Sequence, residues 1–377
     1  MSCFRFLLPA LALLPALAQA QATPSDSTVT RAAAPATAPT TPASPLTFYG
    51  FLDGYLGYDF NDPAAHARPG FLFSHNRTNE FAVNQGLVGA RYQDAHVRAA
   101  LGLHAGTYPE ANYAAEPGTL RNLYEAYAGF RPTAKTWLDV GVFASHIGLE
   151  SAISKDNITL SRSLMAENTP YFETGARLTY EASAKLTLTG LVLNGWQNIR
   201  ENNHGKAFGT QIQWKPTAKL QLNSSTFFGN EQPQDSARRY RYFHDFYLTY
   251  AATDRLSLAG VFDIGQQRRA RTPGADTWHA GAAFVRYKLS EQWAAAVRAE
   301  YYYAERGVLI ASIAPAATAP DFLVRGASLN LDYAPTAHVL ARIEGRVLSS
   351  RTQLFADAAG QPARTYGNLT TSLAFAF

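Results

Sequence analysis

The residues that could do chemistry in this sequence are scattered rather than grouped. The chain has no G-x-S-x-G nucleophile motif, no G-x-x-x-x-G-K phosphate loop, no H-E-x-x-H zinc motif and no cysteine cluster. Its nine histidines are spread along the chain, and His204, His244 and His279 stand alone. A lone histidine is more often a surface residue than a catalytic base. The sequence therefore predicts no enzyme, no cofactor and no metal, although a Ser/His/Asp set assembled from distant loops stays open.

Charged residues are few for a soluble protein. They make up 16% of the 377 residues, against about 25% in ordinary soluble domains, while aromatic residues reach 12%. The aromatic content supplies apolar surface to bury, which argues against a disordered chain. A soluble helical protein would need more Lys and Glu on its exposed faces. The net charge of +4 is small and the basic residues are dispersed, so nucleic acid is not an expected partner.

The N-terminus reads as an export signal. Arg5 precedes an apolar run, Phe6 to Leu17, which is too short to span a bilayer and ends at an A-x-A site. We expect a signal peptide over 1–20, with cleavage after Ala20 or Ala22. The only cysteine lies inside it, so the mature chain has neither disulfides nor thiolate chemistry. The Thr/Ala/Pro-rich segment 23–45 has no apolar periodicity and is expected to be a disordered periplasmic tail.

From Phe48 onward the apolar pattern has a period of two. Between Arg255 and Ile264, for example, every second residue is Leu, Gly, Phe or Ile. Such alternation predicts a strand with one apolar and one polar face. The apolar faces carry small and aliphatic residues in mid-strand and aromatic residues near the strand ends, which suits a lipid surface between two membrane interfaces.

The connections between the strands alternate strictly between short and long. Three short ones are nearly one sequence: Arg131-Pro-Thr-Ala-Lys135, Lys215-Pro-Thr-Ala-Lys219 and Ala334-Pro-Thr-Ala-His338. Tight turns alternating with long polar loops are typical of outer-membrane barrels, whose turns face the periplasm and whose loops face outward. The sequence thus predicts an all-β fold over 46–377, a closed antiparallel transmembrane β-barrel of sixteen strands. Counts of 14 or 18 stay open, because a short segment can be miscounted.

The end of the chain carries an assembly signal. The last strand is apolar at every second position and ends in an aromatic residue, like the segment that the barrel-assembly machinery reads in bacterial outer-membrane barrels. The residues of this predicted signal are Leu369, Thr371, Leu373, Phe375 and Phe377.

One stretch resembles a known family. Gly148-Leu-Glu-Ser151, Asp156-Asn157, Ser161-Arg-Ser-Leu164, Pro170-Tyr171 and Thr174-Gly175 look like the putative beta-barrel porin-2 family, as does the opening stretch from Phe48 to Tyr55. The resemblance covers about residues 46–377. It implies a porin-like barrel in the outer membrane of a Gram-negative bacterium, and it names no solute.

The strand register predicts which charges face the interior. Sixteen strands enclose an aqueous lumen, whereas about eight are filled by their own side chains. Both signs occur among the predicted lumen charges, and the small positive balance of the mature chain favours a slight preference for anions. These charges are Asp53, Arg98, Glu125, Asp139, Arg177, Asp245, Asp263, Arg298, Glu300, Arg342, Glu344 and Arg346.

The longest connection, 145–169, is the candidate constriction. In general porins the loop at this place folds inward, and the apolar residues of this one need burial, so we expect the same here; a loop packed on the outer rim is the alternative. Its predicted lining residues are His146, Glu150, Lys155, Asp156, Asn157, Arg162 and Glu167.

Together these features predict a porin, a passive diffusion channel for small hydrophilic solutes in the outer membrane. The expected partners are outer-membrane lipid, the barrel-assembly machinery during biogenesis and the solutes, and association into a homo-oligomer is left open. A plugged structural or adhesive barrel whose outer loops bind a partner is the first alternative, and an outer-membrane barrel enzyme is the second.

Overall fold

The computed structural model describes residues 44–270, 272–310 and 320–377. The predicted signal peptide and nearly all of the predicted tail lie outside these residues.

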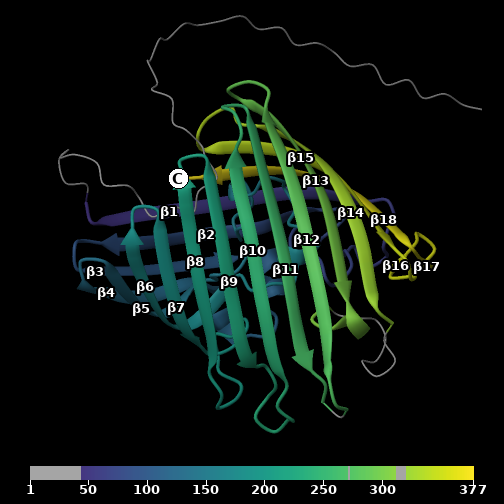
Figure 1. The fold of residues 1–377 in the computed structure, drawn as a ribbon. Helices are drawn as coiled ribbons and strands as arrows, with labels where there is room; N and C mark the ends of the chain where they lie inside the picture. The colour runs from purple at the N-terminus through teal and green to yellow at the C-terminus, as the bar shows by residue number, and fades with distance from the viewer. Residues whose placement is uncertain (1–43, 271, 311–319) are drawn as a thin grey trace, which may run out of the picture. The chain divides into compact units, whose positions relative to one another are not determined.

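Sixteen antiparallel strands close into one barrel (Figure 1), which confirms the predicted fold and excludes counts of 14 and 18. The first strand pairs with the second on one side and with the last on the other. Closure leaves no strand edge unpaired, which a membrane requires because lipid offers no hydrogen-bond partners. The strands are β1 (Leu46–Asp59), β2 (Phe81–Gln93), β3 (Val97–Ala105), β4 (Leu123–Thr133), β5 (Thr136–Ala144), β6 (Phe172–Ser183), β7 (Leu186–Leu193), β8 (Ala207–Thr217), β9 (Leu220–Asn230), β10 (Tyr240–Ala251), β11 (Leu256–Arg268), β12 (Ala275–Lys288), β13 (Trp293–Ala304), β14 (Phe322–Tyr333), β15 (Val339–Ser350) and β18 (Thr365–Ala376).

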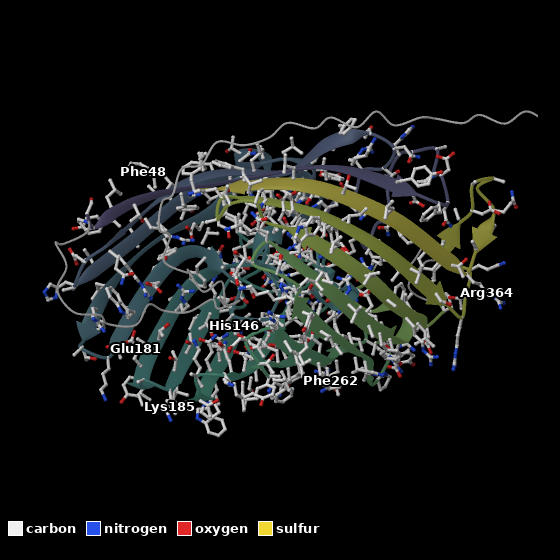
Figure 2. All side chains as sticks on the ribbon, turned by 90° about the horizontal axis from the view of Figure 1, so that it is seen from above. Phe48, His146, Glu181, Lys185, Phe262 and Arg364 are labelled. Atoms are coloured by element: carbon white, nitrogen blue, oxygen red, sulfur yellow. The ribbon has the colours of Figure 1, made fainter. Side chains whose placement is uncertain are left out.

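Side chains alternate between the two faces of the wall. In β11, Ala259, Val261 and Asp263 are buried and face the interior, while Phe262 and Ile264 are exposed on the outside. Figure 2 shows Phe262 at the periphery and His146 among the interior side chains.

The outer face is aliphatic or small in mid-strand and aromatic at both ends of the barrel. Such bands are typical of barrels that cross a membrane, where they lie at the two interfaces. Within the described ranges, no helix is long and apolar enough to cross a membrane. Exposed aromatic residues of the two bands include Phe48, Phe130, Tyr180, Trp214, Tyr250, Tyr287 and Phe375 at one end, and Tyr58, Phe60, Phe81, Phe208 and Tyr242 at the other.

The short connections all lie at one end of the barrel, which we call the turn end; the other is the loop end. Side chains cap the turns: Asp94 Oδ1 accepts from the backbone N–H of Val97 at 2.8 Å, and Thr253 Oγ1 accepts from that of Leu256 at 3.0 Å. These side-chain hydrogen bonds satisfy backbone N–H groups that have no partner in the pairing between strands. In each repeated Pro-Thr-Ala segment the threonine hydroxyl caps the turn in the same way and accepts from the backbone N–H two residues on.

The long connections contain short elements that the sequence pattern does not predict, because they are too short to show a period. These are α1 (Thr107–Asn112), η1 (Gly118–Asn122), η2 (Ser154–Asp156), α2 (Leu164–Glu167), η3 (Glu305–Gly307) and a small hairpin outside the barrel sheet, β16 (Phe355–Ala356) with β17 (Pro362–Ala363).

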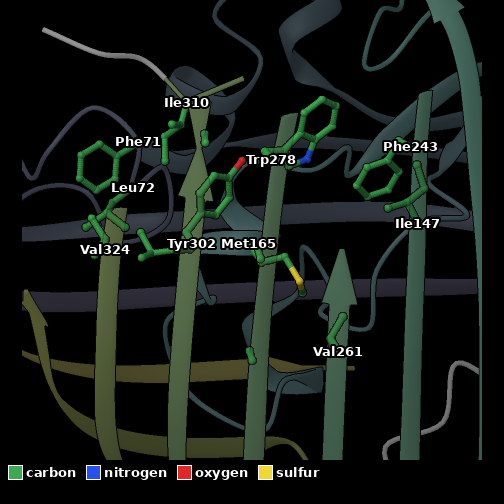
Figure 3. Close-up of a cluster of buried hydrophobic side chains, with 14 of the residues drawn as sticks. Phe71, Leu72, Ile147, Met165, Phe243, Val261, Trp278, Tyr302, Ile310 and Val324 are labelled. Carbon is green, nitrogen blue, oxygen red and sulfur yellow. The ribbon is translucent and has the colours of Figure 1, made fainter. Parts of the chain in front are cut away.

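Part of the interior is apolar. Trp278, Tyr302 and Val324 on the inner wall pack with Phe71 and Met165 from two of the connections (Figure 3). The lumen is therefore narrowed by packed side chains along β10–β14, which the expectation of a polar interior did not include.

Candidate functional site

The connection between β5 and β6, residues 145–171, lies inside the barrel, and we call it the inner loop. Leu160 N donates a hydrogen bond to Asn330 Oδ1 on β14 at 3.0 Å. Leu164 N donates to Glu300 Oε2 on β13 at 2.7 Å. In the strand order β13 and β14 lie across the barrel from β5 and β6. The inner loop therefore crosses the lumen.

Arginines of the barrel wall donate hydrogen bonds to carbonyl groups of the inner loop, which would otherwise need water as a partner. Arg342 on β15 donates to the carbonyl oxygens of Ser154, Asn157 and Ile158 at 2.8, 3.1 and 3.0 Å. Arg298 on β13 donates to a further loop carbonyl at 2.6 Å. Because buried backbone carbonyls are costly without partners, these bonds fix the path of the loop.

Carboxylates neutralise these arginines and Arg346 on β15, in one pair between adjacent strands and in two pairs that reach across β14. Each pair is buried, so removing one partner would leave an uncompensated charge in the interior. The pairs are Arg342 Nε–Asp332 Oδ1 at 2.7 Å, Arg298 Nη2–Glu344 Oε1 at 3.0 Å and Arg346 Nη2–Glu300 Oε1 at 2.8 Å.

Charges closer to the turn end are open to water. Arg98 on β3 and Arg177 on β6 both bind Asp139 on β5, at 2.6 and 2.9 Å. Arg98 can reach across β4 to Asp139 because the β4 residue between the two in the register is Gly129. A Cβ atom at Gly129 would lie 2.2 Å from Asp139 Oδ1. The two arginine side chains are 19% and 21% exposed and the carboxylate 0%. Two guanidinium groups over one buried carboxylate leave a net positive surface.

A second cluster uses glycines in the same way. Tyr49 on β1 reaches over Gly89 and Gly102 to donate to Glu125 Oε1 on β4 at 2.5 Å. Arg91 Nε donates to the same oxygen at 2.8 Å and is half exposed.

Asp245 and Asp263 are register partners on β10 and β11, and both are buried. Asp245 accepts from Gly148 N of the inner loop at 3.3 Å and from Asn223 Nδ2 at 3.1 Å. The described residues provide no ion-pair partner for either carboxyl group. All twelve predicted lumen charges stand at inward-facing strand positions, and ten of them, all but Arg98 and Arg177, are buried.

His146 anchors the start of the inner loop. Its Nδ1 lies 2.9 Å from the carboxylate of Glu173 and its Nε2 lies 2.9 Å from the carbonyl oxygen of Thr226. Both neighbours accept hydrogen bonds, so both ring nitrogens donate, as in the protonated ring. Burial lowers the pKa of His146, but the charge and hydrogen bond of Glu173 outweigh it, so the pKa is raised above its ordinary value.

Arg162 and Glu167 are packed inside the loop rather than open to water. The Arg162 guanidinium lies 4.0 Å from the ring centre of Tyr108 and 4.4 Å from that of Tyr171, and this side chain is buried. Glu167 accepts from the backbone and hydroxyl of Ser74, which comes from the connection after β1. Asn157 is also buried.

The other predicted lining residues reach the solvent to different extents. Asp156 is exposed, and Lys155 and Glu150 are half-buried. The Glu150 carboxylate accepts from Ser163 N at 3.0 Å, and burial raises its pKa. Of the seven predicted lining residues, these three are the ones with water-accessible surface on the loop.

The sequence interpretation missed several groups that hold the site together. Glu173 has the same strand parity as Arg177, so the register of β6 could have identified it. His75 Nε2 binds Asp53 Oδ2 at 2.9 Å, and Ser154 Oγ binds the same oxygen at 2.7 Å. No signal in the sequence indicates His75, because its connection has no periodicity that would place it inside the barrel.

One serine–histidine contact bears on the alternative that the barrel is an enzyme. Ser224 Oγ lies 2.8 Å from His244 Nε2, but both residues are on the outward face of the wall. Among the described residues no carboxylate contacts His244 Nδ1 to complete a triad.

Known proteins are similar to this chain in fold. A family model described as "Putative beta-barrel porin-2, OmpL-like" matches residues 45–377. The anion-selective porin from Comamonas acidovorans superposes with a TM-score of 0.60 at 8% identity, over 88% of this chain and 99% of that chain. OmpT of Vibrio cholerae gives a TM-score of 0.58 at 10% identity over 88% and 97% of the two chains. OprB of Pseudomonas putida gives 0.57 at 9% identity over 88% and 94%. Identities this low show the fold alone, and no curated protein matches the chain in sequence.

Proposed function

The chain belongs to the putative beta-barrel porin-2, OmpL-like family, and from this premise we propose that it is a passive diffusion channel for small hydrophilic solutes. It is a porin-like barrel of the outer membrane, with a fold shared by solved porins. The inner loop carries the proposal. Hydrogen bonds to residues of the far wall hold the inner loop across a sixteen-stranded lumen, and a loop in this place narrows the passage. The function then needs no catalytic step.

The water-exposed charges support a route for polar solutes. Arg98, Arg177 and Arg286 expose 19%, 21% and 29% of their side chains inside the wall. We place the narrowest part of the channel where Glu150, Lys155 and Asp156 meet the water. The exposed guanidinium groups outnumber the exposed carboxylates near the turn end, which favours a slight preference for anions.

The orientation and export of the barrel belong to the same proposal. The signal peptide over 1–20 directs the chain across the inner membrane, and the tail 23–45 and the turn end lie in the periplasm. The barrel-assembly machinery reads the last strand. OmpT of Vibrio cholerae is described in a trimer form, which supports a homo-oligomer here as well.

Liposome swelling tests this function. Proteoliposomes holding the folded barrel are diluted into isosmotic arabinose, a disaccharide or a tetrasaccharide, and light scattering follows the entry of solute. We expect rates that fall steeply with solute size, and a rise for the larger sugars when residues 150–160 are deleted. Liposomes with heat-denatured protein are the control. No swelling by folded protein in any sugar would refute the channel.

A plugged barrel is the second candidate, and one observation favours it. Phe71, Leu72 and Met165 pack against the inner wall and exclude water from that part of the lumen. If this packing extends across the whole passage, folded protein will be inert in the swelling assay, and binding of a partner to the outer loops becomes the function to test.

A further inference from the structure

Two arginines of the inner wall use only part of their hydrogen-bonding capacity. Arg98 on β3 donates from Nε and Nη2 to the two carboxylate oxygens of Asp139, at 2.6 Å each. Arg177 on β6 donates from the same two atoms to Asp139 Oδ2, at 3.1 and 2.9 Å. Neither Nη1 atom donates to any residue that the structure describes, although each carries two N–H groups. Because both side chains are partly exposed, a solute in the lumen can accept from these groups.

Aromatic rings and the shared carboxylate hold the two guanidinium groups in place. The guanidinium carbon of Arg98 lies 4.5 Å from the ring centre of Trp137, and that of Arg177 lies 4.4 Å from the ring centre of Phe143. Both groups contact the same oxygen, Asp139 Oδ2, so they lie side by side. Stacked and doubly bonded guanidinium groups have little freedom left to lose, which favours the binding of an anion between them.

A tyrosine and a third arginine lie on the neighbouring row of the inner wall. Tyr127 on β4 and Arg91 on β2 are both register partners of Ala100 on β3. The Tyr127 phenol interacts electrostatically with all three arginines, and its hydroxyl group has no hydrogen bond to any residue that the structure describes. Arg91 donates through Nε alone, to Glu125, and its side chain is 52% exposed. Free donors of four side chains therefore lie in the same part of the lumen.

The charges of this group of residues do not balance. Three guanidinium groups face two carboxylates, those of Asp139 and Glu125, whose side chains are 0% and 6% exposed. The carboxylates are thus nearly withdrawn from water, whereas the arginines are open to it. An anion that enters from the turn end meets positive charge and N–H groups before it meets either carboxylate.

We propose that this arginine–tyrosine cluster, Arg91, Arg98, Arg177 and Tyr127, binds a phosphate group, either of inorganic phosphate or of a small phosphate ester. A phosphate monoester has three terminal oxygens and nearly two negative charges at neutral pH, which suits three guanidinium groups and one hydroxyl donor. A carboxylate has two oxygens and one charge, and leaves part of these donors without an acceptor. The proposal rests on the proposed function for the route by which the solute reaches the lumen.

Equilibrium dialysis with radiolabelled inorganic phosphate tests the site on the folded barrel in detergent, with chloride keeping the ionic strength constant. We expect saturable binding by the unmodified protein. Y127F removes one free donor and should weaken the binding roughly tenfold, the effect of losing a hydrogen bond to a charged group. R177K keeps a cation beside Asp139 but removes the free Nη1 group, and should weaken the binding to a similar extent. Y92F is the matched control and should bind phosphate normally, because the Tyr92 hydroxyl contacts Asp94 on the outward side of β2.

Heat-modifiable migration on a gel confirms that each variant is folded. Absence of saturable binding by the unmodified protein, or equal affinities of Y127F and Y92F, would overturn the site. Displacement of the label by acetate as readily as by phosphate would overturn its assignment to phosphate. Displacement by glycerol phosphate assigns the site to phosphate esters, and its absence assigns the site to inorganic phosphate. Dialysis in detergent needs no conduction, so a failure of the site and a failure of the proposed channel give different results.

Discussion

At the scale of single residues, glycines decide which charges can meet. Gly129 allows Arg98 to cross a whole strand to Asp139, and Gly89 and Gly102 make room for Tyr49 in the same way. The sequence shows these glycines only as interruptions of an alternating pattern. Their role requires the register between strands, which the sequence does not contain. The charges themselves could be assigned to the inner face, whereas their pairings could not.

Gly129→Ala is expected to destabilise the barrel by about 1–3 kcal/mol, because the new methyl group collides with the shared carboxylate and overpacking costs this much. Gly190→Ala is the matched control, since no heavy atom lies within 4 Å of its Cβ position. Urea unfolding from liposomes, followed by tryptophan fluorescence, measures both. Equal free energies of unfolding for the two variants would contradict the packing argument.

The protonation of two residues should couple the inner loop to pH. His146, which faces Glu173, Asp245 and the Thr226 carbonyl, has a raised pKa, and so has Glu150. A group with a raised pKa binds its proton more tightly when folded. Its contribution to stability is therefore complete below its unfolded pKa and is lost as the pH rises through the folded value.

We expect the loop anchoring to weaken as the pH rises above about 6.5, the unfolded pKa of histidine. Hydrogen–deuterium exchange should then speed up in residues 145–171 between pH 6 and 9 by more than the intrinsic pH effect, with the strands as internal reference. His146→Gln should flatten this dependence above neutrality. An inner loop that exchanges in step with the strands at every pH would count against the assignment.

At the scale of elements, the strands were predictable and the paths of the loops were only partly so. The period-two pattern of β11 follows directly from its sequence, because one face meets lipid and the other the interior. The inner loop was expected inside because its apolar residues needed burial, and Leu160 and Leu164 are indeed 0% exposed. Phe71 and Leu72 are also apolar and buried, although they belong to a long connection, a kind expected to face outward. The tight turns depend on neighbouring residues and can therefore be predicted from the sequence. The contacts across the lumen join residues far apart in the sequence and cannot.

The closing strand provides an element-level prediction. Phe377 and Gly50 exchange two backbone hydrogen bonds at 3.1 Å where β18 meets β1. Deleting Phe377 removes both bonds and the terminal aromatic of the predicted assembly signal. We expect less folded, heat-modifiable protein in the outer membrane, measured by gel and immunoblot of membrane fractions. Phe130→Ala, which removes an aromatic from the same end of the barrel, should leave the level nearly unchanged.

Normal levels of folded protein after deletion of Phe377 would show that neither the signal nor these two bonds matter for assembly.

At the scale of the whole molecule, a closed wall and a loop pinned inside it together determine what can pass. The wall follows from the sequence, because period, turn spacing and an even strand count all agree. The free width of the passage does not follow from the sequence, because it depends on how tightly the inner loop and the connection carrying Phe71 pack against β10–β14. That packing separates the channel from the plugged barrel.

Single-channel recording in planar bilayers tests the central claim most directly. The account predicts discrete conductance steps that are proportional to voltage for the folded protein, and larger steps after deletion of residues 150–160, because the inner loop sets the narrowest width. Steps of equal size in both proteins would show that the loop does not form the constriction. Folded protein that inserts but never conducts, with or without residues 150–160, would contradict the channel itself.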